Sequence, residues 1–250
     1  MTTSIKFLCP SAIEQCRMAI MKAIPIPSAA RIKQPIRELS RNGKQQSSTL
    51  LLPGISWSQY EQFLDVFSDR QFYLTYDRGR MEIRMPTPEH ERPATLFDKL
   101  LTLLTLAFDL EIYSLGSTTF TSAWAEKGLE PDQCYYLKRI DKVMGKKRID
   151  LGTMPPPDLA IEIDVTSSSI PRLPIYASFG VPEVWRYDGD TFTILRLGKK
   201  GYRPAKLSLH FPMLPVDEVL AWIQLGERTA DGVMLKEVQR WCNKHQRKDS

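Results

Sequence analysis

The segment from Pro157 to Val165 places the strongest constraint on how this chain folds. Its sequence, PDLAIEIDV, reads as a β-strand in which Glu162 and Asp164 lie on one face and aliphatic side chains on the other. Acids two residues apart on a strand have Cα atoms about 6.6 Å apart, so both carboxylates can reach one cation. The pattern predicts a hard-metal site on a sheet. The alternative is the solvated polar face of an edge strand.

The composition is that of a globular protein with a substantial core. Hydrophobic residues make up 42% of the 250 positions, which suits one large domain with appendages or two small domains. The 34 basic residues exceed the 29 acidic ones only slightly, so the net charge of +5 favours an anionic partner weakly.

Cysteine spacing and hydropathy indicate the cellular compartment in which the protein is expected. The four cysteines are scattered without the spacing of a zinc site or a disulfide framework. No apolar run approaches the roughly 18 residues of a membrane span, and charged residues interrupt the first 30 positions, where a signal peptide needs an apolar core. We therefore expect a cytoplasmic protein with no membrane partner.

Proline distribution and periodicity predict three regions and the elements of the middle one. We expect 1–47 to be a poorly ordered N-terminal extension, 48–226 to be the main domain and 227–250 to be a C-terminal helical tail. The expected elements are, in order, a helix from Ser56 or Ser58 to about Ser68, a hairpin around Asp77-Arg78-Gly79, a long helix from Thr87 with Pro93 in its first turn, strands at Glu111–Tyr113, Asp132–Leu137 and Leu159–Val165, a helix from Pro171 to Phe179 ended by Gly180, a hairpin around Asp188-Gly189, a strand from Tyr202 to Leu209 and a helix from Val216 to Leu225.

Three motifs together resemble a known family. They are Gly-Val-Pro-Glu-Val-Trp at 180–185, Pro-Asp-Leu-Ala-Ile-Glu at 157–162, and His90 opening the long helix. In their order and spacing over about residues 50–225 they resemble the Uma-type restriction endonucleases, a divergent branch of the PD-(D/E)xK nuclease superfamily. The resemblance implies a mixed α/β fold of the restriction-endonuclease type, with an αβββαβ core whose central mixed sheet is flanked by helices.

The resemblance also implies an endonuclease that depends on magnesium or manganese. Carried over to this chain, Asp132 is the motif aspartate, Glu162 the motif glutamate, and Asp164 a further ligand or a water-orienting group. The usual lysine is missing, because its strand position holds Asp164 and its position in the following helix holds Arg172. An arginine stays protonated, so Arg172 can neutralise a phosphate but cannot take a proton from water.

The serines at 167–169 predict the start of the helix that carries Arg172. Backbone N–H groups and the positive end of the helix dipole would then lie beside the acidic strand, where a phosphate can bind, with Arg172 on the first turn. The alternative is plain N-capping by Ser168 or Ser169, with Arg172 solvated.

Three further residues are candidates for a supporting role around the ion. Glu130 is expected as an outer carboxylate, with a solvated turn residue as its alternative. His90 matches a recurrent position of the resembled family near the cleft, with a capping or packing role as its alternative. Asp158 lies roughly 13 Å along the strand from Glu162, too far to share one ion, so it suits an outer position or a structural role at the strand start.

A dense basic cluster is expected in a hairpin between the two acidic strands. We expect its side chains to contact DNA phosphates, with a solvated loop as the alternative. The cluster consists of Lys138, Arg139, Lys142, Lys146, Lys147 and Arg148.

Taken together, these features predict a magnesium-dependent DNA endonuclease that hydrolyses phosphodiester bonds. The first alternative is a catalytically degenerate protein of nuclease fold that binds DNA or a protein. A glycosidase would need an acid with a raised pKa opposite a second carboxylate, and the sequence shows neither. Because cutting a duplex requires two strand cuts, we expect a homodimer.

Overall fold

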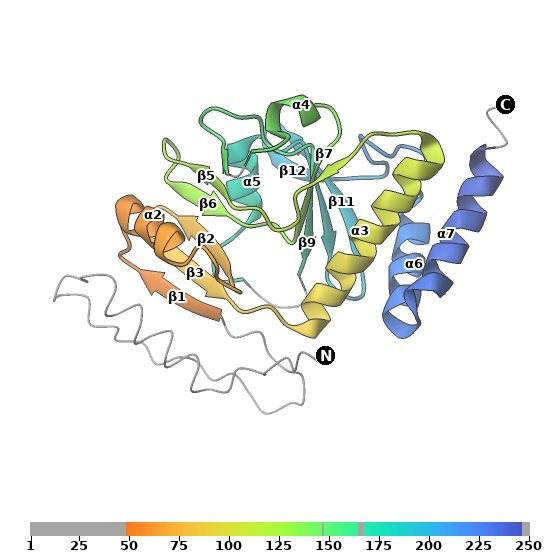
Figure 1. Ribbon diagram of the computed structural model, residues 1–250, viewed down its shortest axis with the longest axis horizontal. Helices are drawn as coiled ribbons and strands as arrows, with labels where there is room; N and C mark the ends of the chain where they lie inside the picture. Colours follow the sequence, from red (N-terminus) through yellow and green to blue (C-terminus); the bar gives the residue numbers. More distant parts are fainter. Residues whose placement is uncertain (1–48, 147, 165–167, 247–250) are drawn as a thin grey trace.

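The computed structural model describes residues 49–146, 148–164 and 168–246, which form two six-stranded sheets with helices around them (Figure 1). The extension expected at 1–47 lies outside the described residues, as do Lys147, Val165 and Ser167. Within the described part, no helix has the length and apolar character needed to span a bilayer.

The first sheet has the strand order β1-β3-β2-β6-β5-β8. Its strands are β1 (Thr49–Pro53), β2 (Tyr73–Asp77), β3 (Arg80–Arg84), β5 (Phe120–Ser122), β6 (Lys127–Leu129) and β8 (Ile149–Asp150). Neighbouring strands are antiparallel except β5 and β8. Strands β2 and β3 form the predicted hairpin. Its turn residues Arg78 and Gly79 both have positive φ, 40° and 88°, as a tight hairpin turn requires.

The second sheet has the strand order β12-β11-β10-β9-β7-β4. Its strands are β4 (Tyr113–Ser114), β7 (Gln133–Tyr136), β9 (Leu159–Ile163), β10 (Glu183–Tyr187), β11 (Phe192–Gly198) and β12 (Gly201–Ala205). Strands β9 and β10 are parallel, and the other neighbours are antiparallel. The acidic strand β9 lies between β7 and β10, so the alternative of a solvated edge strand is wrong.

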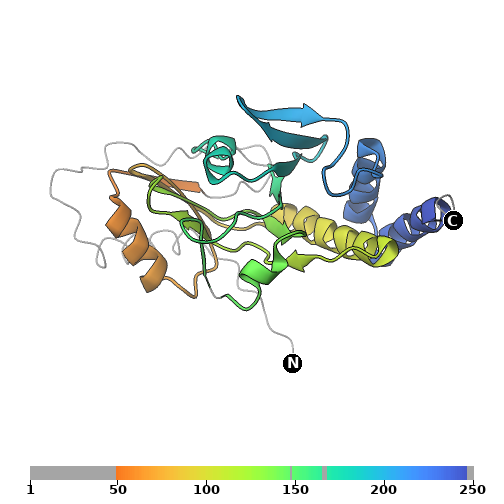
Figure 2. The ribbon, with the colours of Figure 1, turned by 90° about the horizontal axis from the view of Figure 1, so that it is seen from above.

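Helices cover both faces of the second sheet. The helices of the described residues are α2 (Trp57–Val66), which packs on the first sheet, α3 (Pro88–Phe108), α4 (Ile140–Val143), α5 (Leu173–Phe179), α6 (Val216–Arg228) and α7 (Asp231–Gln246). Helices α3, α6 and α7 gather on one side, and α7 packs along α3 (Figures 1 and 2). Helix α5 lies on the opposite face, where its apolar side chains meet both sheets.

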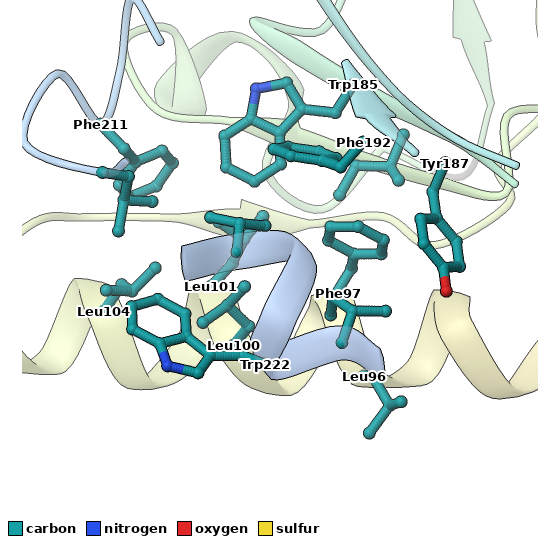
Figure 3. Packing of buried hydrophobic residues seen from close by; sticks show 14 of the residues in the cluster. Leu96, Phe97, Leu100, Leu101, Leu104, Trp185, Tyr187, Phe192, Phe211 and Trp222 are labelled. Atoms are coloured by element: carbon teal, nitrogen blue, oxygen red, sulfur yellow. The ribbon is translucent and has the colours of Figure 1, made fainter. Parts of the chain in front are cut away.

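The face of the second sheet toward α3 holds the larger core. Leu159, Ile161 and Ile163 of β9 are buried in it, as their alternation predicts. Figure 3 shows how α3 fills this core, with Phe97 facing the aromatic side chains of β10 and β11. The Phe97 ring centroid lies 6.3 Å from that of Trp185 and 5.6 Å from that of Phe192. Each such fully buried side chain stabilises the fold by roughly 1.5–3 kcal/mol.

The other face of β9 points toward α5 and the first sheet. Ala160 packs there with Ile175 and Phe179 of α5, and with Leu129 of the first sheet. Glu162 follows Ala160 on this face and is almost fully buried. The fold therefore places a carboxylate in the seam between the two sheets, where its charge needs partners.

The restriction-endonuclease type of α/β fold is confirmed, and several local predictions need correction. Helix α3 begins at Pro88, so Pro93 lies in its second turn. The basic segment is not a hairpin, because it forms the short helix α4 and then β8. Strands β5 and β6 are additional to those expected, since segments of three residues carry no usable periodicity. The helix predicted for 171–179 begins at Leu173 and ends at Gly180, whose φ of 76° is the left-handed cap expected.

Candidate active site

Glu162 occupies the seam between the sheets and is held by two donors from the α5 region. Arg172 is the N-cap residue of α5, and its Nε lies 2.7 Å from Oε2 of Glu162 while its Nη2 donates to Oε1 at 2.9 Å. Tyr176, one turn further along α5, donates its hydroxyl to the same Oε1. Both oxygens of this carboxylate are therefore engaged.

Asp132 lies at the start of β7, the strand next to β9, and its oxygens are also engaged. Oδ1 accepts a hydrogen bond from Arg84 Nη2 at 2.7 Å, and Oδ2 accepts one from the backbone N–H of Ile163 at 2.7 Å. His90 Nε2 lies 3.1 Å from Oδ2. Asp132 is thus tied to the backbone residue that follows Glu162, which places the two predicted carboxylates side by side.

The two carboxylates differ in their acidity. Burial alone would raise the pKa of Asp132, but the Arg84 guanidinium and His90 outweigh it and hold that pKa well below its usual range. Burial raises the pKa of Glu162 above its ordinary value, although Arg172 opposes the shift, and the nearby charge of Asp132 raises it further. The effect of each carboxylate on the other follows from their proximity.

His90 lies on the first turn of α3 and bridges three charged groups. Besides Asp132, its Nε2 lies 2.6 Å from Arg84 Nη1, and its Nδ1 lies 3.4 Å from an oxygen of Glu91. Burial lowers the pKa of His90, but hydrogen bonds with Asp132 and Glu91 outweigh this and raise it to about 9. His90, which was expected near the cleft, therefore contacts Asp132 of the carboxylate pair.

Arg84 is a buried site residue that the sequence motifs did not reveal. It ends β3, and its guanidinium carbon lies 5.0 Å above the ring of Tyr73. The available sequence signal was the alternation in the predicted hairpin, which places Glu82 and Arg84 on the same polar face of one strand. Glu82 is buried as well, and it accepts hydrogen bonds from the hydroxyl of Ser168 and the backbone N–H of Ser169.

Asp164 stands apart from the carboxylate pair. Its side chain is about a third exposed at 32%, and its Oδ2 forms an ion pair with Arg186, a residue that lies beside Glu162 on β10. Across residues 49–146, 148–164 and 168–246, no three His, Cys, Asp or Glu side chains are grouped closely enough to hold one ion. The alternation of β9 placed Asp164 on the expected face, but the neighbouring strand supplies its partner.

Glu130 and Asp158 both hold backbone and arginine groups. Glu130 pairs with Arg70 and accepts hydrogen bonds from Thr119 at 2.6 Å and from the backbone N–H of Leu74 at 2.9 Å. Its backbone carbonyl accepts a hydrogen bond from Arg172, so its main chain borders the centre.

Asp158 fixes the end of β7. Its Oδ2 accepts hydrogen bonds from the backbone N–H groups of Leu137 at 2.8 Å and Lys138 at 2.9 Å, and its Oδ1 pairs with Arg139 at 2.9 Å. These contacts match the structural role that was left open for Asp158 in the sequence.

A pocket of about 530 Å³ is lined in part by Glu162, one of the two carboxylates. Charged and polar side chains of Arg84, Glu162, Asp164, Ser168, Arg172 and Arg186 contribute to its lining. Arginine residues from the end of β3, the start of α5 and β10 therefore line one hollow together with Glu162. Such a combination suits an anionic group such as a phosphate.

A sequence profile described as "Putative restriction endonuclease", the Uma2 family, matches residues 57–227. The chain belongs to the Uma2 family. The matched span begins at α2, so it contains every strand of the two sheets except β1, together with the carboxylate pair and the pocket. No curated protein matches. A crystal structure from Anabaena variabilis, described as a putative nuclease belonging to DUF820, is 14% identical with a TM-score of 0.42, and the match covers 60% of this chain and 90% of that one.

Ser168 and Ser169 do not cap helix α5 in this Uma2 protein. Helix α5 has Arg172 at its N-cap without a side-chain cap, and Ser168 and Ser169 bind Glu82 instead. The seven-residue helix carries Pro174 near its start. Among the described residues, the serine-capped helix start that the sequence predicted is therefore absent, and Arg172 occupies the N-cap position.

The basic cluster of this Uma2 protein is spread over the segment from the end of β7 to β8. Arg139 is held by Asp158, and Arg148 forms an exposed ion pair with Asp65 of α2 at 2.8 Å. Lys142 pairs with Asp141 on the surface of α4. Lys147 lies outside the described residues.

Proposed function

We propose that this Uma2 protein is a magnesium-dependent DNA endonuclease whose centre is the carboxylate pair Asp132 and Glu162. The observation that supports the proposal is their position on neighbouring strands β7 and β9, linked by the hydrogen bond from Ile163 N–H to Asp132. Membership of the family agrees with this chemistry. The pocket beside the pair supplies room and positive groups for the DNA backbone.

The donor chemistry of the pair fits magnesium or manganese. Magnesium keeps several of its waters and is commonly held by one or two carboxylates together with substrate phosphates, so Asp132 and Glu162 would hold it once their contacts with Arg84 and Arg172 open. When bound, the ion supplies a Lewis acid that lowers the pKa of water. Asp164 takes its expected role as a further ligand or water-orienting group only after its pair with Arg186 opens.

The protein groups around the pair bind and orient the phosphate. Arg172 lines the pocket while it contacts Glu162, so its guanidinium can neutralise charge that develops on a phosphodiester. His90 acts through Asp132, whose charge and orientation it fixes. Glu130 and Asp158 support the carboxylate pair indirectly, because their hydrogen bonds hold the chain before and after β7.

A second function, DNA binding without cleavage, is favoured by one specific observation. Arg84 and Arg172 already contact Asp132 and Glu162, so the guanidinium groups neutralise both carboxylates. An ion can enter only if these contacts rearrange. This alternative retains the same DNA-facing pocket and differs only in whether the phosphodiester bond is cut.

Cleavage of supercoiled plasmid DNA in magnesium or manganese separates the two functions. We expect nicking by the native chain and none by Glu162→Ala or Glu162→Gln, purified identically. Arg240→Gln on α7, whose exposed side chain pairs with Glu237, is the matched control and should cut like the native chain. Salt-sensitive DNA binding by a native chain that does not cut would favour the second function.

We also infer that the basic segment contacts DNA and that two copies act together on a duplex. Lys138, Arg139, Lys142, Lys146 and Arg148 follow the end of β7 that is farther from Asp132, so a duplex that contacts both the basic segment and the carboxylates has to extend along β7. Light scattering with and without duplex DNA tests the dimer. Removing Lys142 and Lys146 together should weaken DNA binding in a salt-dependent way.

A further inference from the structure

We propose that Arg84 is a second phosphate-binding residue, which forms with Arg172 a clamp for one phosphodiester group of the DNA backbone. The inference rests on the proposed action on DNA and deepens it, because it assigns a binding role to a residue outside the family motifs. It concerns the binding of the backbone, and it holds whether or not the bond is then hydrolysed.

The two arginines reach the same pocket from different parts of the fold. Arg84 ends β3 of the first sheet, whereas Arg172 begins α5 after the central strand of the second sheet. Both line the pocket, and their side chains are only 8% and 9% exposed. Two guanidinium groups that belong to residues lining one hollow can both donate hydrogen bonds to one phosphate.

Arg84 has hydrogen-bond donors to spare. A guanidinium carries five N–H donors, and Arg84 uses Nη2 toward Asp132, while its Nη1 lies 2.6 Å from His90 Nε2. Its Nε is buried and has no partner among the residues that the structure describes. An unpaired buried donor is costly, so a phosphate oxygen that accepts from this guanidinium would recover the lost hydrogen bond.

Arg84 is also held in place before any ligand arrives. Tyr73 lies beneath its guanidinium at 5.0 Å, and Asp132 fixes one edge at 2.7 Å. Tyr73 is in turn anchored by its hydroxyl, which donates to Glu91 at 2.8 Å. A side chain that is already ordered loses little conformational entropy on binding, which favours a geometric role in phosphate recognition.

The charge of the two carboxylates should control how tightly the clamp binds a phosphate, whereas a purely structural ion pair would have no effect on phosphate binding. Asp132 and Glu162 compete with a phosphate for the same guanidinium groups. Replacing Asp132 by asparagine keeps a hydrogen-bond acceptor for Arg84 but removes a negative charge. We therefore expect Asp132→Asn to bind DNA more tightly than the native chain when no divalent ion is present.

The test measures fluorescence anisotropy of a short labelled duplex in EDTA over a series of salt concentrations. The comparison is Asp132→Asn against the double variant Arg84→Gln/Asp132→Asn, in which neither buried side chain is charged. We expect the loss of Arg84 to weaken binding about tenfold, as for one charge-assisted hydrogen-bonded contact. The slope of log K against log salt should fall by about one.

Arg240→Gln serves as the matched control for loss of an arginine charge far from the pocket, and thermal melting checks that each variant folds. Arg84→Lys in the Asp132→Asn background replaces the double variant if the latter does not fold, and it should bind more weakly because lysine lacks the planar fork. Equal affinity and equal salt slope with and without Arg84 would overturn the clamp, as would loss of DNA binding on Asp132→Asn.

Failure of the clamp is distinguishable from failure of the proposed hydrolysis. A native chain that does not cut plasmid DNA in magnesium, but shows the Arg84 effect in EDTA, retains the clamp without the nuclease activity. A chain that cuts DNA while Arg84 has no effect on binding retains the activity without the clamp.

Discussion

Tyr176 donates its hydroxyl hydrogen to Oε1 of Glu162, the same oxygen that accepts from Arg172. The tyrosine is fully buried on α5, and it stands in the sequence as an ordinary core aromatic. This carboxylate oxygen therefore accepts one hydrogen bond from a charged donor and one from a neutral donor.

Replacing Tyr176 by phenylalanine should destabilise the protein by roughly 1.5–3 kcal/mol, because a buried carboxylate loses a charge-assisted hydrogen bond. Urea denaturation measures the effect as a lower midpoint at unchanged slope. Tyr202→Phe is the matched control, since Tyr202 donates to the neutral carbonyl of Val181 at 2.6 Å and its loss should cost about 1 kcal/mol. Equal losses for the two variants would contradict the assignment.

Gly128→Ala should destabilise the protein by about 1–3 kcal/mol through overpacking. A Cβ atom at this position on β6 would lie 2.0 Å from the hydroxyl of Tyr60, a fully buried residue of α2. Gly232→Ala on α7 is the control, because a Cβ there meets nothing within 4 Å and helix propensity favours alanine by up to about 1 kcal/mol. Thermal unfolding of the two variants should therefore shift in opposite directions.

The contribution of Asp158 to stability should depend on pH. Burial alone would raise its pKa, but the backbone N–H groups of Lys138 and Leu137 and the side chain of Arg139 lower it below the ordinary value. A lowered pKa in the folded state means that the contribution is present above the unfolded pKa, about 3.9. It is lost as the pH falls through the still lower folded value.

Asp158→Asn should accordingly cost about 1–3 kcal/mol at pH 7, and the difference from the native chain should shrink below pH 4. Denaturant titrations at several pH values give this comparison directly. A difference that stays constant down to pH 3 would show that the charge of Asp158 contributes nothing to the fold.

Helix α7 should prove to be an integral part of the domain core. Val238 is fully buried in the cluster that α7 shares with α3, so Val238→Asp should destabilise the protein by roughly 3 kcal/mol or more. Val233 lies on the same helix but is 44% exposed, and Val233→Asp should have little effect. Similar denaturation midpoints for the two aspartate variants would mean that α7 does not stabilise the domain.

The parts of the fold that the sequence predicted are those with strong periodicity. The apolar stripe of α3, the alternation of β9 and the turn chemistry at Asp188-Gly189 each report a local preference that the tertiary structure keeps. The short strands β5, β6 and β8 have two or three residues, and their pairing depends on partners far along the chain. The division into two sheets follows from that pairing, so no local pattern contains it.

The candidate site divides in the same way. Asp132, Glu162 and Arg172 come together as the motif spacing predicted, because each sits at a fixed place on β7, β9 or the start of α5. Arg84 was missed because a single arginine in a hairpin strand carries no motif. The pairing of Asp164 with Arg186 depends on the register between β9 and β10, which the sequence of either strand alone does not specify.

The chain passes from β6 of the first sheet to β7 of the second through the short connection Glu130, Pro131 and Asp132. The carboxylate of Asp132 therefore lies where the two sheets are connected, with Arg84 in the first sheet and Glu162 in the second. Any rotation of one sheet against the other would pull these three side chains apart. The charged centre can assemble only in molecules whose two halves have docked, which makes its chemistry a reporter of complete folding.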